Sequence, residues 1–427
     1  MKRHNNPSRS EWGQVCLRPT ATLEAMMPTV KTIFDAVKKT GDQALIEYTL
    51  KFDQVDCTSF QIPAETISEA KAKIPEPLRK AIGQAHRNIT AFHSAQRTNP
   101  IRIETQPGVQ CWQEKLPIER VGLYIPGGSA PLFSTVLMLA IPAKIAGCKE
   151  IVLCSPPQIN GTIAPEIRYA AHLCGVTQMF TLGGAQAIAA LALGTESVPK
   201  VDKIFGPGNQ FVTAAKQYAS QGSVAIDMPA GPSEVLVAID ASGNPAFVAA
   251  DLLSQAEHGP DSQVVLVTTA PEKINEIQKE IEIQLKALPR KDIAAKALEN
   301  SKIVSFNKTS MAIEFINHYA PEHYIINVVD TNPYVKNVRH AGSVFIGALT
   351  PESFGDYASG TNHTLPTNGY ARQYSGVNLD SFQKAITFQE INSEGIQSLG
   401  PAVEIMAAAE GLEGHKNAVS LRLKSLQ

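Results

Sequence analysis

The stretch that decides the fold spans residues 121–129 and reads Val-Gly-Leu-Tyr-Ile-Pro-Gly-Gly-Ser. Its first five residues predict a short buried strand, and an apolar helical segment follows the glycines. A glycine-rich turn between a strand and a helix is typical of parallel α/β sheets. Such a turn also leaves backbone N–H groups at a helix amino terminus, where they can receive an anion.

The same succession of strand, turn and helix recurs over the next hundred residues. Strands are predicted at 150–154, 178–182, 203–205 and 224–226, and helices at 163–174, 185–193 and 211–218. Strands and helices alternating at this spacing predict a doubly wound parallel sheet. Three of the turns carry paired or near-paired glycines. Phe211, however, stands where the third glycine of the dinucleotide fingerprint belongs, so the sheet suits a nucleotide without carrying the diagnostic motif.

The flanking regions differ in character from this repeat. The first hundred residues are predicted to be mainly helical, with helices at 30–39, 44–50 and 76–95, and the character changes at residue 120. After residue 230, strands are predicted at 235–239, 264–268 and 344–346, with an amphipathic helix at 271–288. The segment after Asp380 is predicted to be more helical, with a helix at 396–410 that Gly411 and Gly414 end. A helical piece of this kind, following a completed sheet, often serves as an arm onto a neighbouring subunit.

Length, charge and cysteine usage exclude several classes of protein. At 427 residues the chain is expected to form two or more domains. A net charge of -2 gives no electrostatic case for binding nucleic acid or an anionic membrane. The apolar run at 136–148 is too short to span a bilayer, and the basic N-terminus lacks the apolar segment of a secretory signal. Six scattered cysteines without a Cys-x-x-Cys pair favour a reducing cytoplasm over a disulfide framework or a thiolate metal site.

Two polar stretches, at residues 254–262 and 355–363, contain the side chains best suited to bind a metal ion. Gln255 and His258 stand three residues apart, so on a helix they would face the same way. Together with Asp356 and the late His415 they would supply oxygen and nitrogen donors to a zinc ion. Taken singly, each residue has a structural alternative. Gln255 and His258 could be a cap and a core histidine, Asp356 a turn residue beside His363, and His415 a solvated surface histidine.

Glu322 and His323 follow a proline and form a second candidate pair. His323 is a plausible general base, because histidine titrates near neutral pH, and Glu322 could activate a water molecule. Adjacent side chains diverge on a strand or a helix, so the two residues are expected to take different tasks. The alternative is a pair of solvated residues after a turn. The loop-rich segment 226–234 is expected to form either a cleft wall or a hinge without ligand contact.

Taken together and in order, these motifs resemble those of the histidinol dehydrogenase family, and the resemblance runs from about residue 20 onward. It rests on Tyr-Ile-Pro-Gly-Gly-Ser (124–129), Gly-Gly-Ala-Gln-Ala (183–187), Phe-Gly-Pro-Gly-Asn (205–209) and Ala-Gly-Pro-Ser-Glu (230–234). It rests further on Ser-Gln-Ala-Glu-His-Gly (254–259), Pro-Glu-His (321–323), Gly-Thr-Asn-His-Thr-Leu-Pro-Thr (360–367) and His-Lys-Asn-Ala (415–418). Gly414, where the family is expected to have another small residue, is a trivial departure.

The resemblance implies the oxidation of L-histidinol to L-histidine by two NAD, through an aldehyde, in a cytoplasmic homodimer whose C-terminal arm reaches the partner's site. It implies two incomplete Rossmann-like domains, one built from residues 21–127 and 233–377 and a NAD-binding one from 128–232. Helical extensions at 1–20 and 378–427 would form the dimer arm. Matched position by position, the implied roles are zinc ligands (Gln255, His258, Asp356, His415), the acid/base pair (Glu322, His323), NAD contacts (Tyr124, Gln186, Asn209) and substrate contacts (Ser233, His363, Glu410).

In the implied mechanism, zinc orients histidinol, His323 removes a proton in each oxidation, and Glu322 helps water add to the aldehyde. Two other classes of protein compete with this interpretation. A cysteine-dependent aldehyde dehydrogenase would need an activated thiolate, but Cys111, Cys148, Cys154 and Cys174 stand in apolar or strand contexts. A non-catalytic protein that binds zinc and nucleotide would bind its ligands without forming NADH, and the intact Glu322-His323 pair argues against it.

Overall fold

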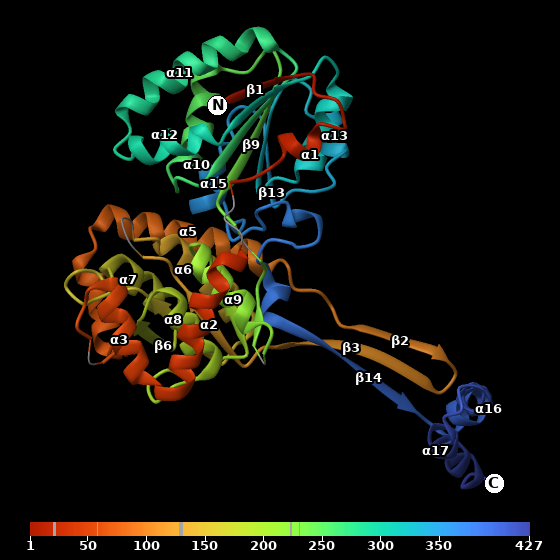
Figure 1. Cartoon of the computed structure of the whole chain (residues 1–427). Helices are drawn as coiled ribbons and strands as arrows, with labels where there is room; N and C mark the ends of the chain where they lie inside the picture. The colour runs from red at the N-terminus through yellow and green to blue at the C-terminus, as the bar shows by residue number, and fades with distance from the viewer. Residues whose placement is uncertain (20–22, 58, 128–130, 223, 230) are drawn as a thin grey trace. The chain divides into compact units, whose positions relative to one another are not determined.

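A computed structural model describes residues 1–427 except 20–22, 58, 128–130, 223 and 230 (Figure 1). Gly128 and Ser129 of the opening motif and Ala230 of a later one therefore lie outside the described residues. The chain forms two compact units. The first contains Met1–Gln96 and Ile118–Ser381, and the second contains Arg97–Pro117 and Phe382–Gln427.

The predicted strand–helix repeat forms a five-stranded parallel sheet in the first unit. Its strand order is β6-β5-β4-β7-β8, built from β4 (Arg120–Tyr124), β5 (Glu150–Ser155), β6 (Gln178–Thr181), β7 (Lys203–Phe205) and β8 (Ala225–Ile226). The connecting helices are α6 (Phe133–Ala146), α7 (Pro165–Cys174), α8 (Gly184–Leu193) and α9 (Gln210–Ala219). The doubly wound parallel architecture predicted from the sequence is confirmed.

Helices from the first hundred residues complete this part of the molecule. They are α2 (Leu23–Thr40), α3 (Asp42–Asp53), α4 (Ala64–Glu69) with the short η1 (Ala70–Lys73), and α5 (Glu76–Ser94). The apolar face predicted for α2 is buried, with Val30 fully inaccessible and Ile33, Phe34 and Val37 nearly so. These side chains share one core with residues of α8 and α9. The helical prediction for this region is therefore confirmed.

A six-stranded parallel sheet forms the other core of the first unit. Its order is β1-β11-β10-β9-β12-β13, built from β1 (Lys2–Asn5), β9 (Glu234–Ile239), β10 (Gln263–Thr268), β11 (Lys302–Ser305), β12 (His323–Asn327) and β13 (Ser343–Ile346). Its helices are α1 (Trp12–Val15), α10 (Pro245–Ala256), α11 (Ile274–Ala287), α12 (Lys291–Glu299), α13 (Thr309–Tyr319), α14 (Asn332–Lys336) and α15 (Glu352–Tyr357). Every residue of β9, β10 and β12 is buried, as expected where helices cover both faces of a parallel sheet.

The first residues depart from the helical extension that we expected at 1–20. Residues 2–5 form the edge strand β1, which pairs in parallel with β11, and only a four-residue helix follows. Side chains of β1 are mostly exposed, so the strand carries little of the apolar pattern by which a sequence reveals one. Backbone hydrogen bonding to β11, rather than an apolar pattern of side chains, holds this strand in place.

The second unit contains strands that the sequence did not reveal. An antiparallel sheet of order β14-β3-β2 is formed by β2 (Ile101–Gln106), β3 (Val109–Pro117) and β14 (Gln383–Ile391). Two helices follow, α16 (Ser393–Ala409) and α17 (Glu413–Lys424). The prediction of mainly helical structure after Asp380 is wrong for β14, and Gly414 lies inside α17 rather than ending a helix. Most residues of β14 are exposed, so no buried alternation marks the strand.

Among the described residues, no helix is both long and apolar enough to cross a membrane. The chain's long apolar helix, α6, is instead buried along almost its whole length.

Burial of one carboxyl group on α10 makes the stability of the first unit dependent on pH. Asp251 is 9% exposed, and burial raises the pKa of its carboxyl group to about 7. This value lies above the ~3.9 of an unfolded aspartate, so the folded state holds the proton more tightly. The resulting stabilisation is present at acidic pH and is lost as the pH rises through 7.

We expect Asp251→Asn to raise the free energy of unfolding most at pH 8, where the buried carboxylate is ionised, and by a smaller amount at pH 5, where only the unfolded state has lost the proton. Urea unfolding at both pH values measures the difference. Glu257→Gln, a change in a carboxylate outside this buried position on the same segment, is the control. An equal effect of Asp251→Asn at both pH values would contradict the assignment.

Candidate active site

The acid/base candidates lie at the amino-terminal edge of the six-stranded sheet. His323 is the first residue of β12 and Glu322 immediately precedes it, while Glu234 is the first residue of the neighbouring β9. Ligands of parallel sheets usually bind at the opposite, carboxyl edge, so the position of this pair is unusual for such a sheet. The chain enters this sheet at β9 from the loop 227–233, which brings that loop to the amino edge.

The backbone of Glu234 holds both members of the pair. Its N–H donates to Glu322 Oε2 at 2.7 Å, and its carbonyl oxygen lies 3.1 Å from His323 Nδ1. The two side chains do not diverge as expected, since Glu322 Oε2 lies 3.6 Å from His323 Nδ1. Glu322 stands outside the strand, where the alternation of side chains does not apply, and the Glu234 N–H directs its carboxylate back toward the imidazole.

His323 is buried, and both of its ring nitrogens have partners. Nε2 lies 3.1 Å from Asp356 Oδ1, and Nδ1 lies 2.9 Å from Gln255 Nε2. When Nε2 carries the proton and donates to Asp356, Nδ1 accepts from the Gln255 amide. The ring also stacks on Phe345 with centroids 5.9 Å apart. The imidazole is thus held in one orientation by contacts on every side.

The electrostatic environment of this pair favours proton transfer. Burial lowers the pKa of His323, but the carboxylates of Glu322 and Asp356 outweigh it and hold that pKa well above its usual value. Burial also raises the pKa of Glu322, against the opposing effect of His323. Strongly perturbed pKa values that combine burial with specific charged partners are characteristic of catalytic groups. The alternative of two solvated residues is wrong, because both are buried.

Gln255 carries the observation that best fits a bound metal. Its side chain is 1% exposed, and its Oε1 has no hydrogen-bond partner. The amide nitrogen faces His323 Nδ1 and the Glu234 carbonyl oxygen, which leaves the oxygen as the free atom. A buried amide oxygen without a partner is costly unless a ligand satisfies it. A metal ion bound by this oxygen would supply that partner.

His258 and Asp356 lie within electrostatic range of each other, and His258 is exposed at the turn after α10. The shared-helix prediction is wrong here, since α10 ends at Ala256, but the His258 N–H donates to the Gln255 carbonyl oxygen and continues the turn. Within the described parts of the chain, no group of three or more His, Cys, Asp or Glu side chains could hold a metal.

The remaining residues of the predicted metal and substrate groups are distributed over both units. His363 Nδ1 lies 2.8 Å from the Asp356 carbonyl oxygen and its Nε2 lies 3.3 Å from Thr135 Oγ1, while Ser233 is half-buried directly before β9. Glu410, at the end of α16, and His415, in α17, belong to the second unit and are exposed.

The three predicted dinucleotide contacts lie at the carboxyl edge of the five-stranded sheet. Tyr124 ends β4, and its hydroxyl accepts a hydrogen bond from Gly184 N at 3.1 Å. Gln186 is 1% exposed, and neither its Oε1 nor its Nε2 has a partner. Asn209 caps α9, with its Oδ1 accepting from Val212 N at 3.0 Å. An unsatisfied buried amide beside glycine turns fits a polar ligand, as this edge of a parallel sheet favours.

Sequence reasoning missed the groups that support the site. Arg18 donates to Glu234 from Nε at 2.6 Å and from Nη2 at 3.0 Å, and its Nη2 also donates to the Tyr319 carbonyl oxygen at 2.7 Å. Glu352 Oε1 accepts from Ser254 Oγ at 2.6 Å, which joins α15 to α10. Glu234 was visible within the motif at 230–234, whereas no pattern in the sequence marks Arg18, 216 residues from its partner.

The cysteines provide no activated nucleophile. Burial raises the pKa of Cys148 to about 11 and raises the pKa of Cys154 and Cys174 still further. None of the six cysteines forms a disulfide, and Cys111 alone is more than slightly accessible. A buried thiol with a raised pKa is inert rather than reactive, which disfavours a cysteine-dependent mechanism.

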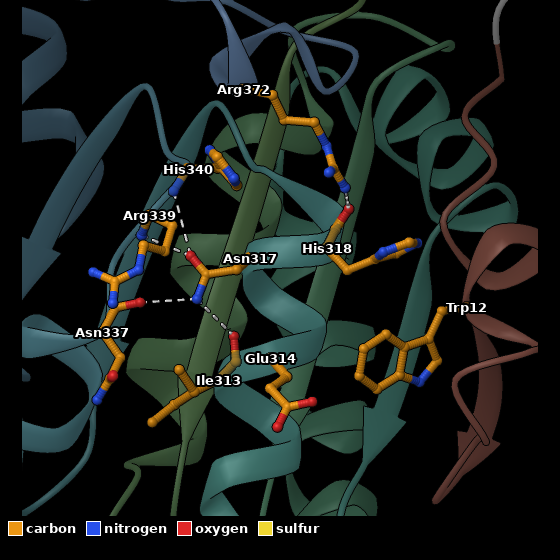
Figure 2. A pocket seen from close by; sticks show the side chains of 9 residues that line it. All are labelled: Trp12, Ile313, Glu314, Asn317, His318, Asn337, Arg339, His340 and Arg372. Carbon is orange, nitrogen blue, oxygen red and sulfur yellow. Dashed lines mark hydrogen bonds between the residues drawn. The ribbon is translucent and has the colours of Figure 1, made fainter.

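A pocket of about 450 Å³ opens elsewhere on the first unit, around α13 (Figure 2). Asn317 stands at its centre, and its amide is satisfied by the backbone: Oδ1 accepts from Arg339 N at 2.7 Å and Nδ2 donates to the Asn337 carbonyl oxygen at 2.9 Å. Arg372 donates to the His318 carbonyl oxygen. No predicted site residue lines this pocket.

Comparison with known proteins identifies the family to which the chain belongs. The sequence model of the family described as histidinol dehydrogenase matches residues 16–423. The chain is similar to histidinol dehydrogenase of Bacteroides thetaiotaomicron, with 57% identity over 427 residues that cover 100% of both chains. It is also similar to histidinol dehydrogenase of Escherichia coli K12, with 53% identity over 426 residues that cover 99% of this chain and 97% of that one.

Solved structures extend the comparison to the fold. An acetylating aldehyde dehydrogenase from Geobacillus thermoglucosidasius, 14% identical, shares the fold alone, with a TM-score of 0.50 over 88% of this chain and 93% of that one. The crystal structure of histidinol dehydrogenase from Elizabethkingia anophelis matches with a TM-score of 0.96 and 54% identity over 100% of this chain and 98% of that one. With full-length identity above half, a matching family model and a superimposable structure, the chain belongs to the histidinol dehydrogenase family of oxidoreductases.

Proposed function

We propose that this chain oxidises L-histidinol to L-histidine through L-histidinaldehyde, the last two steps of histidine biosynthesis, with two NAD and one zinc ion per subunit. The names of its full-length relatives support the substrate. The observation that carries the chemistry is the buried His323 imidazole, held between the carboxylates of Asp356 and Glu322 beside the unpaired oxygen of Gln255. None of the six cysteines forms a disulfide, which supports a cytoplasmic setting.

His323 acts as the general base in both oxidations. It takes the proton from the substrate hydroxyl in the first and from the hydrated aldehyde in the second. The two neighbouring carboxylates support this role, because they stabilise the imidazolium that forms when the ring takes a proton. The contacts to Asp356, Gln255 and Phe345 keep the ring in a single orientation, which lowers the entropic cost of reaching the transition state.

Glu322 assists the addition of water to the aldehyde. Its carboxylate is buried, its pKa is raised by that burial, and the Glu234 N–H fixes Oε2 at 2.7 Å. A carboxylate with a raised pKa is better matched to proton transfer near neutral pH than a solvated one. Glu322 and His323 can therefore exchange protons with substrate and water in the same buried space.

Zinc would be held by Gln255, His258 and Asp356 of one subunit together with His415 of the other. When bound, zinc orients and polarises the substrate. The unpaired Gln255 Oε1 supports this set, although amide, carboxylate and imidazole donors would also accept Mn or Co. Ser233 and His363 contact the substrate from the same subunit, and Glu410 contacts it from the partner.

The dinucleotide would bind across Tyr124, Gln186 and Asn209. When bound, NAD accepts the hydride. The unsatisfied side-chain amide of Gln186 supports a polar ligand at this point. Asn209 uses its side-chain oxygen to cap α9, so its amide N–H groups would be the ones to bind the ligand. The expected domain division, with a NAD-binding domain at 128–232, remains part of this proposal.

A homodimer with shared active sites accounts for the exposed position of the late residues. In the second unit, Ile405, Met406 and Leu421 are 71%, 65% and 58% exposed. Large apolar side chains gathered on two adjacent helices favour an interface with another chain. His415 and Glu410 stand on these same two helices, so docking of α16 and α17 on a partner would bring both residues to the partner's site.

The yield of NADH per L-histidinol consumed tests the proposed reaction. We expect two NADH per substrate from the zinc-loaded protein, loss of the activity on chelation, and recovery when zinc is restored. One NADH with release of the aldehyde would contradict the second oxidation and the role of Glu322. Ligand binding without NADH would favour the non-catalytic class.

His323→Ala should lower turnover by about 10²–10⁴-fold, the usual cost of losing a general base. Steady-state kinetics with both substrates saturating measures the change. His318→Ala, which removes an exposed histidine from the same compact unit, is the matched control and should retain wild-type turnover. Near-normal turnover of His323→Ala would refute the assignment.

Mixed dimers test whether the sites are shared. His323→Ala and His415→Ala are each expected to be inactive alone. After denaturation and refolding together, about a quarter of wild-type activity should return, because half of the dimers are then mixed and each mixed dimer holds one intact site of two. Sites built within one chain would show no recovery.

A further inference from the structure

The turn that carries Asn209 is held by a buried ion pair that the reaction itself does not use. The turn spans residues 206–209, between the end of β7 and the start of α9. Lys216 of α9 and Asp227, directly after β8, form an ion pair with side chains 4% and 1% exposed. Both charges also bind the backbone of the turn.

The two charges hold opposite ends of one residue. Gly206 N donates to Asp227 Oδ2 at 2.8 Å, and the Gly206 carbonyl oxygen accepts from Lys216 Nζ at 2.8 Å. The other carboxylate oxygen, Asp227 Oδ1, accepts from Met228 N at 2.7 Å. The peptide groups on both sides of Gly206 are therefore fixed by charge-assisted hydrogen bonds, the stronger kind in proteins.

Gly206 needs this support because of where it lies. Its φ is +125°, a conformation that side chains disfavour, and a Cβ there would overlap the carbonyl oxygen of Tyr124. The turn thus presses directly on the end of β4, at a predicted dinucleotide contact. Asn209, the last residue of the same turn, caps α9 by accepting a hydrogen bond from Val212 N. A shift of Gly206 would move both Tyr124 and Asn209.

A purely stabilising role does not explain a buried ion pair. Desolvation of two charges consumes most of their attraction, and apolar replacements of such pairs are often neutral or stabilising. An ion pair can, however, fix the positions of the groups to which its two charges are hydrogen-bonded. Here those groups are the backbone atoms of the turn.

We propose that Lys216 and Asp227 are positioning residues for the dinucleotide, which set the 206–209 turn so that Tyr124 and Asn209 can engage it. The proposal rests on the proposed function, since it takes NAD as the ligand of this edge. Neither residue is expected to contact the reacting atoms. Removal of the pair should therefore weaken dinucleotide binding and spare the binding of histidinol.

The test is the double variant Lys216→Met/Asp227→Asn, which removes both charges without leaving one of them buried alone. We expect a melting temperature close to that of the wild type, because removing both charges leaves neither of them buried alone. We expect the NADH dissociation constant, measured by calorimetry, to rise about 10–100-fold, because the groups that contact the dinucleotide are displaced. The dissociation constant of L-histidinol should not change. Hydrogen exchange over residues 205–212 should become faster in the absence of ligand.

Arg120→Met/Glu150→Gln is the matched control. This ion pair joins β4 and β5 of the same sheet at their amino-terminal ends, away from the turn, with Arg120 Nε 2.8 Å from Glu150 Oε2. It should bind NADH as the wild type does. Equal weakening in the control would mean that any loss of charge loosens the sheet, and would overturn the proposal.

The outcomes separate this proposal from the proposed function. A wild-type protein that fails to bind NADH refutes the function, whereas wild-type binding that the double variant retains unchanged refutes the positioning role alone. Lys216→Arg keeps the cation and its donors, so it should bind NADH more tightly than the double variant. If the double variant does not fold, Asp227→Asn, which keeps one acceptor oxygen, is compared with Lys216→Arg in the same way.

Discussion

One buried carboxylate organises the acid/base site. The side chain of Glu234 is paired with Arg18 and accepts a hydrogen bond from Asn368 N at 2.7 Å, and its backbone binds Glu322 and His323. The Arg18 guanidinium also lies 4.0 Å from the centroid of the Tyr319 ring. Because a buried carboxylate without its partner is strongly destabilising, Glu234 can remain in place only while Arg18 is present. The N-terminal segment thereby determines the geometry of a site that its own residues do not enter.

The first unit distributes its chemistry over opposite edges of two parallel sheets. Glycine turns and the unsatisfied side-chain amide of Gln186 lie at the carboxyl edge of the five-stranded sheet, the edge at which parallel sheets usually bind ligands. The acid/base pair lies at the amino edge of the six-stranded sheet, where Glu234 and His323 begin their strands. The hydrogen bond between Thr135 of α6 and His363 is one direct link between these groups of elements. Both edges rely on a buried ion pair that binds backbone atoms, Arg18 with Glu234 in one and Lys216 with Asp227 in the other.

Predictability followed the burial of apolar side chains. The strands of both parallel sheets from β4 to β10 and the face of α2 were predicted correctly, because continuous or periodic apolar runs are what a buried element requires. β1, β2 and β14 were missed, since most of their side chains are exposed and their order comes from pairing. The half-buried β3 and the short buried strands β11 and β12 were not predicted either, so burial alone did not make a strand recognisable. The orientation of the Glu322 side chain was also predicted incorrectly. Its buried carboxylate accepts a hydrogen bond from a backbone N–H that lies 88 residues away in the sequence, and no local pattern reveals such a contact.

The sequence by itself determined the doubly wound sheets, through apolar periodicity and glycine turns, and the membership of a family, through motifs whose order is specific. It also identified the residue types that can act as base, ligand and cap, because those properties belong to single side chains. Only the tertiary structure decided which edge of the sheet bears the proposed acid/base pair, that the side-chain oxygen of Gln255 lacks a partner, and which charges hold the supporting backbone. These depend on burial and on contacts between distant segments, and such contacts exist only once the chain has folded.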